Sequence, residues 1–475
     1  MARFDPCTTP EMKTPETPLA FAGGAAGAVA PFLLFLAGVA WLALSGAPDE
    51  RGFWPVLVAA LGVGLLLARD RSAYVEAVVR GMSRPIVALM ILAWLLAGML
   101  AALLAASGLL DSLLAGGRAL GLEGGAFVAV AFLVASLLST ATGTSLGTLI
   151  VTVPLLYPLA APLAASPAWL LGAVLAGATF GDNLSPVSDT TIASAATQGA
   201  SMGAVVRSRL RYALPAAAGA LVLYALLGGS GATAAITTET ATASWRGAAM
   251  AAVPVLVIAL LLRGANLVAA LLGGAAVAAG LGLALGNFGV ADLMHIDRDA
   301  YLAKGLLLDG LQRGIGISVF TLLLMGLTGG LEASGLVDRA VAATSRWATS
   351  PRRAEIWIFG ATSLAVLLTT HSVVAMLAVG SFASAIGERQ GISRPRRANL
   401  LDVTVCTYPF LLPYFIPTIL ASSLSRAGDE MGLPQVPPWQ AGLLNLHSWG
   451  LLLLLLFAIA TGWGRREGEA RSPRE

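Results

Sequence analysis

The chain of 475 residues is poor in charge, in cysteine and in histidine. Charged side chains make up only 12% of it, whereas a water-soluble domain has about 25%. The two cysteines, Cys7 and Cys406, lie in very different settings, so they suggest neither a disulfide framework nor a metal site. Basic and aromatic residues form no shared patch of the kind that binds nucleic acid. These scarcities argue against a soluble domain, a disulfide scaffold and a nucleic-acid-binding module.

Hydrophobic residues fill 57% of the chain, and its mean hydropathy is +0.81. Apolar runs of about 17–25 residues recur along the whole length, which is the length that crosses a bilayer as an α-helix. Alternating segments of about ten residues, typical of membrane β-barrels, are absent from the sequence. The first apolar run begins near Leu19 after a polar lead and is long enough to span, so we expect no secretory signal. The sequence predicts an all-α, multi-pass protein of the cell membrane, in contact with the lipid bilayer.

Clusters of arginine predict which loops lie in the cytoplasm, because cytoplasmic loops carry an excess of Arg and Lys. The basic clusters are at 69–84, 207–211, 346–353, 388–397 and 465–475. We place them inside, together with both termini. The apolar segment 356–387 has basic flanks on both sides, yet it is too short for two crossings of about 20 residues each. A re-entrant helical hairpin with its tip near 369–372 satisfies both constraints.

A shift of 227 residues aligns the two halves of the chain. The segment SGLLD (107–111) falls on SGLVD (334–338), and tyrosine and proline positions coincide at the same offset. The charge pattern places 69–84 inside and its equivalent near 297–313 outside, so the two copies have opposite orientation. Inverted repeats are typical of secondary transporters, whose site lies near the midplane where the copies meet.

Each predicted repeat has three spans, a hairpin, a broken span and a closing span, which gives about ten transmembrane helices plus two re-entrant hairpins. The predicted parts are a cytoplasmic lead (1–18), repeat 1 (19–229), an external linker (230–246), repeat 2 (247–463) and a cytoplasmic tail (464–475). The hairpins and the broken helices are expected at about 126–166 and 168–200 in repeat 1, and at about 355–387 and 398–425 in repeat 2.

Two carboxylates, Asp182 and Asp189, lie in the apolar part of repeat 1. They are the only charged side chains between Glu123 and Arg207. An ionised side chain at bilayer depth costs about 2.5–3.5 kcal/mol on insertion scales, so an acid there is functional by default. In a water-soluble protein the same two acids would instead be interpreted as a packed cap and a helix-start residue. Because desolvation favours the protonated acid, H⁺ and Na⁺ would compete for these carboxylates.

Helix-breaking residues surround the two acids. Gly181 and Pro186 interrupt the helix, and Ser185 has the form of an N-cap with proline at the first helical position. A half-helix that starts there would direct its positive end at the break. Oxygen-bearing side chains near the break suit a hard cation such as Na⁺. The predicted cation and proton site comprises Asp182, Asp189, Asn183, Ser185, Ser188 and Thr190.

The tips of the two hairpins correspond in the repeat alignment, where Thr144 falls on His371. We expect substrate contacts from Thr142, Thr144, Ser145 and His371. The hydroxyls have the alternative role of satisfying backbone groups, and His371 is either a proton sensor or a neutral, hydrogen-bonded histidine. Asp402 belongs either to the site or, by snorkelling, to the cytoplasmic surface.

The stretch FGDNLSPVSDTTIAS (180–194) closely resembles the signature of the NhaC family of sodium/proton antiporters, within the ion transporter superfamily. TGTSLGT (142–148) and GGLEASGL (329–336) resemble two further stretches of that family. The resemblance implies scaffold and transport domains with re-entrant hairpins, and it assigns the six residues of the predicted site to cation binding. In the second half the chain departs from the family, with Asp402 in place of a paired acid and Tyr414 in place of a tryptophan. The substrate stays open, because relatives also exchange organic acids or amino acids.

The leading expectation is Na⁺/H⁺ exchange by alternating access, with no cofactor besides the transported ions. The alternative is a Na⁺- or H⁺-coupled carrier of a small organic acid or amino acid. No arginine or lysine is expected inside the spans to pair a substrate carboxylate, although helix N-termini at the hairpin tips could do so. A channel would need charges repeated by symmetry, and an enzyme would have only His371 with Asp182 or Asp189, so we expect neither. A homodimer is a further expectation, and nucleic acid is not an expected partner.

Overall fold

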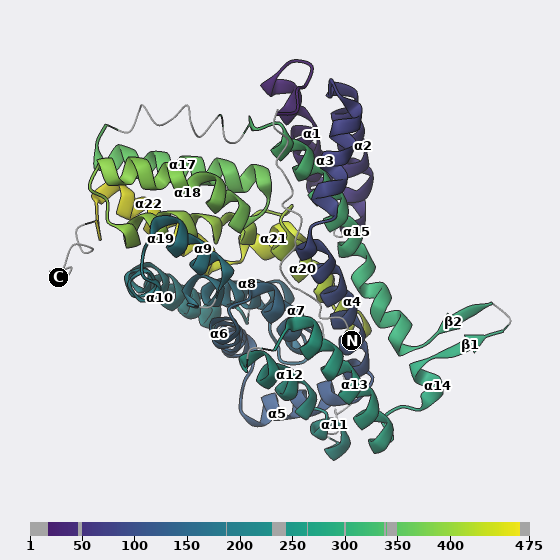
Figure 1. Cartoon of the computed structure of the whole chain (residues 1–475). Helices are drawn as coiled ribbons and strands as arrows, with labels where there is room; N and C mark the ends of the chain where they lie inside the picture. Colours follow the sequence, from purple (N-terminus) through teal and green to yellow (C-terminus); the bar gives the residue numbers. More distant parts are fainter. Residues whose placement is uncertain are drawn as a thin grey trace, which may run out of the picture.

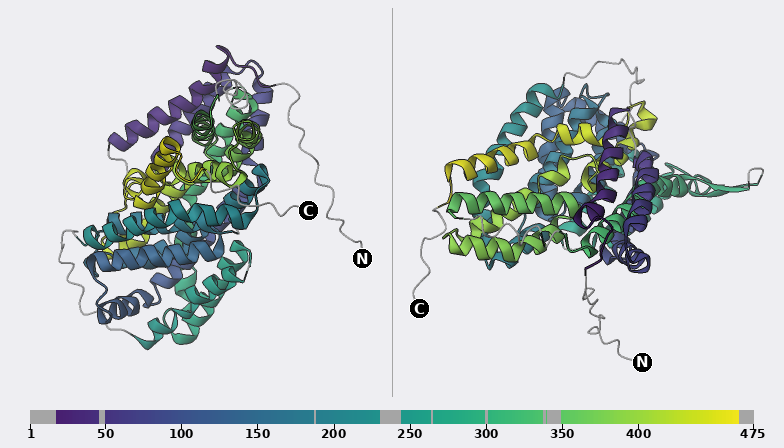
Figure 2. Two further views of the ribbon diagram at one scale, coloured as in Figure 1. Left: turned by 90° about the vertical axis from the view of Figure 1, so that its left-hand side faces the viewer. Right: turned by 90° about the horizontal axis from the view of Figure 1, so that it is seen from above.

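The computed structural model describes residues 18–45, 50–186, 188–229, 244–263, 265–298, 301–336, 339 and 349–465. The predicted lead, external linker and tail lie almost wholly outside these residues. The described part is nearly all α-helix, with one antiparallel strand pair, β1 (His295–Asp297) and β2 (Leu302–Lys304). The pair projects sideways from the helical body (Figure 2).

Seven helices of the described part are long and apolar enough to cross a membrane. They are α1 (Ala25–Leu44), α4 (Pro85–Ala105), α6 (Gly124–Thr142), α10 (Met202–Leu227), α13 (Leu267–Leu285), α15 (Leu306–Ala333) and α18 (Ser372–Arg389). Shorter apolar helices are α2 (Phe53–Leu67), α7 (Ser145–Leu156), α12 (Ala252–Leu262) and α22 (Leu446–Thr461). These helices confirm an all-α, multi-pass membrane protein.

Figure 1 shows two groups of helices that run in different directions. In one group, α1, α2, α3 (Arg71–Met82) and α4 lie beside the long α15. Helices α4 and α15 pack backbone to backbone, because a methyl group at Gly98 would lie 2.2 Å from the Gly310 carbonyl oxygen. In the other group, α6, α8 (Pro167–Leu184) and α10 lie across from α17 (Pro351–Thr369), α18 and α22.

Short elements connect these helices. They are α5 (Leu109–Ala119), α9 (Asp189–Gln198), α11 (Trp245–Ala249), α14 (Val290–Leu293), α19 (Arg394–Val405), α20 (Ile416–Leu424), α21 (Pro438–Leu443) and the 3₁₀ helices Glu50–Gly52, Tyr157–Leu159, Tyr408–Phe410 and Ser425–Met431. Two helices, α3 and α5, lie where loops were predicted. They have 12 and 11 residues, and both contain charged side chains. Neither is therefore long and apolar enough to span a membrane.

The interruptions at the predicted hairpin tips are present. Helices α6 and α7 are joined through Gly143 and Thr144, and α17 and α18 through Thr370 and His371. The arms of the second hairpin are longer than predicted, with 19 and 18 residues, because the polar flanks continue the helices. Helix α18 alone is long enough to span a membrane. The length of this segment is therefore no longer an argument for a re-entrant hairpin, and the re-entrant hairpin stays a prediction.

Backbone conformation repeats at the predicted offset. Gly143 and Thr370 end α6 and α17 in the left-handed region, with φ of 69° and 54°. After the breaks, α9 begins at Asp189 and α20 at Ile416, which are again one offset apart. These coincidences support the predicted repeat. The opposite orientation of its copies and the division into domains stay predictions.

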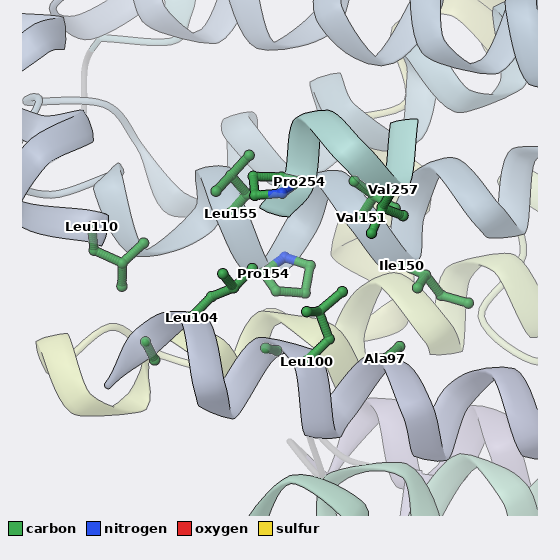
Figure 3. Close-up of a pocket in the computed structure, with 12 residues that line it drawn as sticks. Ala97, Leu100, Leu104, Leu110, Ile150, Val151, Pro154, Leu155, Pro254 and Val257 are labelled. Carbon is green, nitrogen blue, oxygen red and sulfur yellow. The ribbon is translucent and has the colours of Figure 1, made fainter. Parts of the chain in front are cut away.

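Helices α4, α7 and α12 contribute to a small cavity, whose lining residues are drawn in Figure 3. All of them are apolar, among them Leu100, Ile150, Pro254 and Val257, and the cavity measures about 20 Å³. That is about the space of one water, which would find no polar side chain to bind. The cavity is therefore a gap in the packing and suits no ion.

Candidate functional site

The break between α8 and α9 positions the two acids of the predicted site. Helix α8 ends at Leu184, because Ser185 precedes a proline and takes an extended conformation, with ψ of 129°. Helix α9 begins only at Asp189, with Ser188 as the N-cap residue. The predicted helix start at Pro186 is therefore wrong. An acid in the first turn matches the positive end of α9.

Asp182 is buried and is held by two serines. The Ser145 hydroxyl donates to Oδ2 at 3.0 Å, and the Ser188 hydroxyl donates to Oδ1 at 2.7 Å. Because Ser145 is the first residue of α7, the first hairpin tip directly contacts the break. The Thr190 hydroxyl lies 3.0 Å from that of Ser188. Both oxygens of the carboxylate thus have hydroxyl partners.

Close packing of α8 against α6 keeps Asp182 at the hairpin. A methyl group at Gly181 would lie 2.2 Å from the Thr140 backbone nitrogen and 2.3 Å from the Ser139 Cβ atom. Only glycine allows the two helices to approach so closely here. The glycine that was expected to interrupt the helix is instead a helical contact residue.

A cavity of about 340 Å³ lies between the break and both hairpin tips. The predicted site residues that line it are Asp182, Asp189, Thr190, Thr144, Ser145 and His371. Further polar lining comes from Thr370 and Ser372 of the second tip, and Met90, Phe410 and Ile416 are among its apolar lining residues. The structure therefore brings the two tips and both acids to one cavity.

The remaining predicted residues do not line this cavity. Thr142 donates to the Leu138 carbonyl of its own helix at 2.8 Å. Ser188 contacts Asp182, and Ser185 is buried as the C-cap of α8. The Asn183 side chain is fully buried, and within the described part of the chain neither its oxygen nor its nitrogen has a hydrogen-bond partner.

His371 is the N-cap residue of α18 and faces the cavity from the second tip. Its side chain makes no capping bond. Within the described residues, its Nδ1 atom has no hydrogen-bond partner. His371 therefore lines the cavity with a buried ring nitrogen whose hydrogen-bonding capacity is unused among the described residues.

Asp402 of α19 is fully buried and forms an ion pair with Arg209 of α10. The expectation that no arginine lies inside the spans is wrong, because α10 begins at Met202 and includes the whole basic cluster 207–211. Snorkelling of Asp402 to the surface is excluded by its burial. The sequence carried a signal for Arg209, since it shares a helical face with the buried residues Val205 and Tyr212.

Arg209 holds both halves of the broken helix. Its Nη1 atom donates to the carbonyl of Asn183 in the last turn of α8 and, at 2.9 Å, to the Thr191 hydroxyl in the first turn of α9. Its Nε atom donates to Asn399 Oδ1 of α19 at 3.0 Å. One guanidinium group thus fixes the distance across the break.

Asp402 is fully engaged by its neighbours. Besides Arg209, it accepts a hydrogen bond from the Ser194 hydroxyl at 3.0 Å and one from Cys406 Sγ at 3.2 Å. Since an uncompensated buried charge costs several kcal/mol, the pair keeps this region neutral. The cavity is different, because the described residues that line it include two carboxylates but neither lysine nor arginine. Its chemistry suits a cation.

Comparison with known families adds one match. Residues 31–229, somewhat less than half of the chain, are similar to the Na⁺/H⁺ antiporter family. The matched region includes the first hairpin tip, the break and both acids of the cavity. A comparison with curated proteins gives no match.

Proposed function

We propose that this membrane transporter exchanges Na⁺ for H⁺ by alternating access, through the cavity that Asp182 and Asp189 line. The similarity of residues 31–229 to the Na⁺/H⁺ antiporter family supports sodium/proton exchange. The observation that carries the proposal is the pair of carboxylates, uncompensated by lysine or arginine among the described lining residues, at a helix break. A carboxylate that binds either ion, but not both, couples the two fluxes.

Asp189 and Asp182 have different surroundings, and we therefore assign them different steps of ion entry and binding. Asp189 is exposed at the start of α9 and meets an entering ion first. Asp182 is buried behind it, with both oxygens bonded to serine hydroxyls. A hydroxyl is donor and acceptor. Ser145 and Ser188 can therefore donate to the ionised acid and offer lone pairs to a bound Na⁺.

Hydroxyl and backbone oxygens complete the proposed shell around Na⁺. Among the described residues, no group of three or more His, Cys, Asp or Glu side chains is placed to hold a metal ion. A monovalent hard cation does not need such a group, because it binds hydroxyl and carbonyl oxygens as well as carboxylates. The hydroxyls of Ser145, which bonds Asp182 at 3.0 Å, and of Thr190 are such oxygens on the lining.

Movement of the second hairpin tip relative to the broken helix would change the side to which the cavity opens. The first tip contributes Thr144 and Ser145, and the second contributes Thr370 and His371. The Arg209–Asp402 pair fixes α8, α9, α10 and α19 to one another. The broken helix would therefore move as one unit relative to the second tip.

Exchange can be tested in proteoliposomes loaded with a pH dye, with pulses of Na⁺, Li⁺ or K⁺. We expect a Na⁺ pulse to drive H⁺ flux that is lost in Asp189→Asn. The control is Asp309→Asn, which neutralises an exposed acid in the first turn of α15 and should exchange normally. Normal exchange by both Asp182→Asn and Asp189→Asn would remove the cavity from the ion path.

An amino-acid carrier is the second candidate function, and the size of the cavity favours it. About 340 Å³ is far more than one ion needs, since a water fills about 30 Å³. An ammonium group would bind Asp189, and a carboxylate would meet the N-termini of α7 and α18 at Thr144 and His371. A simple organic acid fits less well, because the described lining offers it no lysine or arginine. Proton flux that is driven by pulses of amino acids, but not by pulses of Na⁺, Li⁺ or K⁺, would establish this alternative.

A further inference from the structure

A second polar cavity, of about 510 Å³, lies beside α10, the start of α19 and the segment after α22. Three arginines line it, Arg207 and Arg211 from α10 and Arg396 from α19. Among the described residues that line it there is no carboxylate. A polar cavity this large with several guanidinium groups is built for an anion.

Among the described residues around this cavity, arginines outnumber carboxylates. Arg396 is buried and binds both carboxylate oxygens of Glu355, at 3.0 and 3.2 Å. The same carboxylate also binds Arg465, at 2.8 Å, so it compensates one of these two arginines. Arg207 has no hydrogen bond or ion pair to the described part of the chain and is exposed. The described residues therefore give the cavity a net positive charge.

Neutral donors add to the arginines. Ser393 is the N-cap of α19, a helix of 12 residues, and its side chain makes no capping bond there. The first turn of α19 directs its positive end toward the same cavity. Asn399 also lines the cavity and donates to the Ser208 hydroxyl at 2.7 Å. Charged and neutral donors together match the oxygens of a phosphate group.

A series of polar contacts joins this cavity to the cation site through Cys406, whose single thiol proton is donated either to Asp402 Oδ1 at 3.2 Å or to Thr190 Oγ1 at 3.6 Å. The series begins at Asn399, whose Oδ1 accepts from Arg209 at 3.0 Å. It ends where the Ser188 hydroxyl binds Asp182. Its members in order are Asn399, Arg209, Asp402, Cys406, Thr190, Ser188 and Asp182. Such a network can carry coupling between two sites.

We propose that this basic cavity binds a phosphate-bearing anion and that its occupancy tightens Na⁺ binding at Asp182 and Asp189. The anion offsets positive charge near Arg209, which lowers the electrostatic cost of a cation at the acids. The phosphate comes either from a free anion or from a phospholipid headgroup, which basic pockets between transmembrane helices also bind. The effect on Na⁺ rests on the proposed exchange, whereas anion binding does not.

The test measures binding and transport separately on the full-length purified protein. Binding of inorganic phosphate is measured by calorimetry in detergent, and binding of headgroups by retention of phosphatidic acid from mixed micelles with phosphatidylcholine. We expect Arg207→Gln to weaken binding about tenfold, as loss of one charged hydrogen bond would, and Arg207→Lys to restore part of it. Arg263→Gln, which removes an exposed arginine after α12, is the matched control.

The outcomes separate the two sources and the two halves of the proposal. If both inorganic phosphate and phosphatidic acid bind, the ligand of the cavity is a free anion. If phosphatidic acid alone binds, the ligand is a phospholipid headgroup. Binding of neither, or equal binding by Arg207→Gln, overturns the site. In proteoliposomes the anion should lower the Na⁺ concentration for half-maximal exchange in the native protein but not in Asn399→Ala. An unchanged Na⁺ dependence in the native protein overturns the coupling, and absence of exchange under all conditions overturns the proposed function but leaves the binding result standing.

Discussion

The buried pair of Arg209 and Asp402 makes a quantitative prediction about stability. Arg209→Met removes the charge but keeps a side chain of similar length, so Asp402 loses its counter-ion inside the protein. Both side chains are fully buried, and breaking such a pair from one side costs about 3–5 kcal/mol. Asp402→Asn should cost a similar amount, because it leaves the guanidinium group uncompensated.

The double variant should be more stable than the two single changes suggest. With both charges gone, no uncompensated ion is left, and replacing a whole buried pair is often nearly neutral. What remains is the loss of the Arg209 hydrogen bonds to Asn183, Thr191 and Asn399, about 1 kcal/mol each. We therefore expect a coupling energy of about 3 kcal/mol or more from the double-mutant cycle.

The free energy of unfolding can be measured by titrating the purified protein in mixed micelles with dodecyl sulfate. The surface pair of Asp297 and Lys304 serves as the control, since its side chains are 27% and 52% exposed at an N–O distance of 2.6 Å. Exposed pairs contribute about 0–1 kcal/mol. A coupling energy as small as this for Arg209 and Asp402 would refute the structural role assigned to them. Loss of exchange in a stable double variant would instead place Asp402 in the ion path.

Three further predictions concern the cavity, the packing around it and the topology. Ser188→Ala removes a hydroxyl that stabilises ionised Asp182, a bond of about 1.5–3 kcal/mol, so the pH of half-maximal exchange should rise by about one unit or more; an unchanged profile would contradict this. Gly181→Ala forces a methyl group to 2.2 Å from a backbone nitrogen of α6 and should cost about 1–3 kcal/mol of stability, whereas Gly62→Ala meets nothing within 4 Å and should be tolerated. In a cysteine-free background, Leu120→Cys at an exposed position should react with an impermeant thiol reagent from outside, and labelling from the cytoplasm would overturn the predicted topology.

Much of the fold follows from patterns that are local in the sequence. Apolar length predicts the spans, and residues such as Gly143 mark where helices stop, because local backbone preference decides both. Pro186 correctly predicted a break, but its main effect is on the preceding residue, so α8 ends there and α9 starts three residues beyond the proline. The arms of the second hairpin were placed too short, since polar residues at helix ends continue a helix as readily as they end it.

The partners within the site depend on tertiary packing and could not be predicted in the same way. The contact of Ser145 with Asp182 joins residues on two different helices, and no spacing in the sequence indicates it. Arg209 was missed for another reason, because arginines near a span were assigned to a cytoplasmic loop. Because Asp402 is buried next to Arg209, the guanidinium charge of Arg209 is more stable inside the protein than the sequence alone suggests.

The neutrality of the Arg209–Asp402 pair has an electrical consequence. In the proposed exchange, the carboxylates on the described lining of the cavity that respond to the membrane field are those of Asp182 and Asp189. Two protons discharge both acids, whereas one Na⁺ discharges one, so a turnover that swaps these states carries one net charge across the bilayer. A potential of 100 mV biases that step by about 2.3 kcal/mol. With Asp182 neutralised, Asp189 alone would trade the ions one for one, and voltage would no longer drive the exchange.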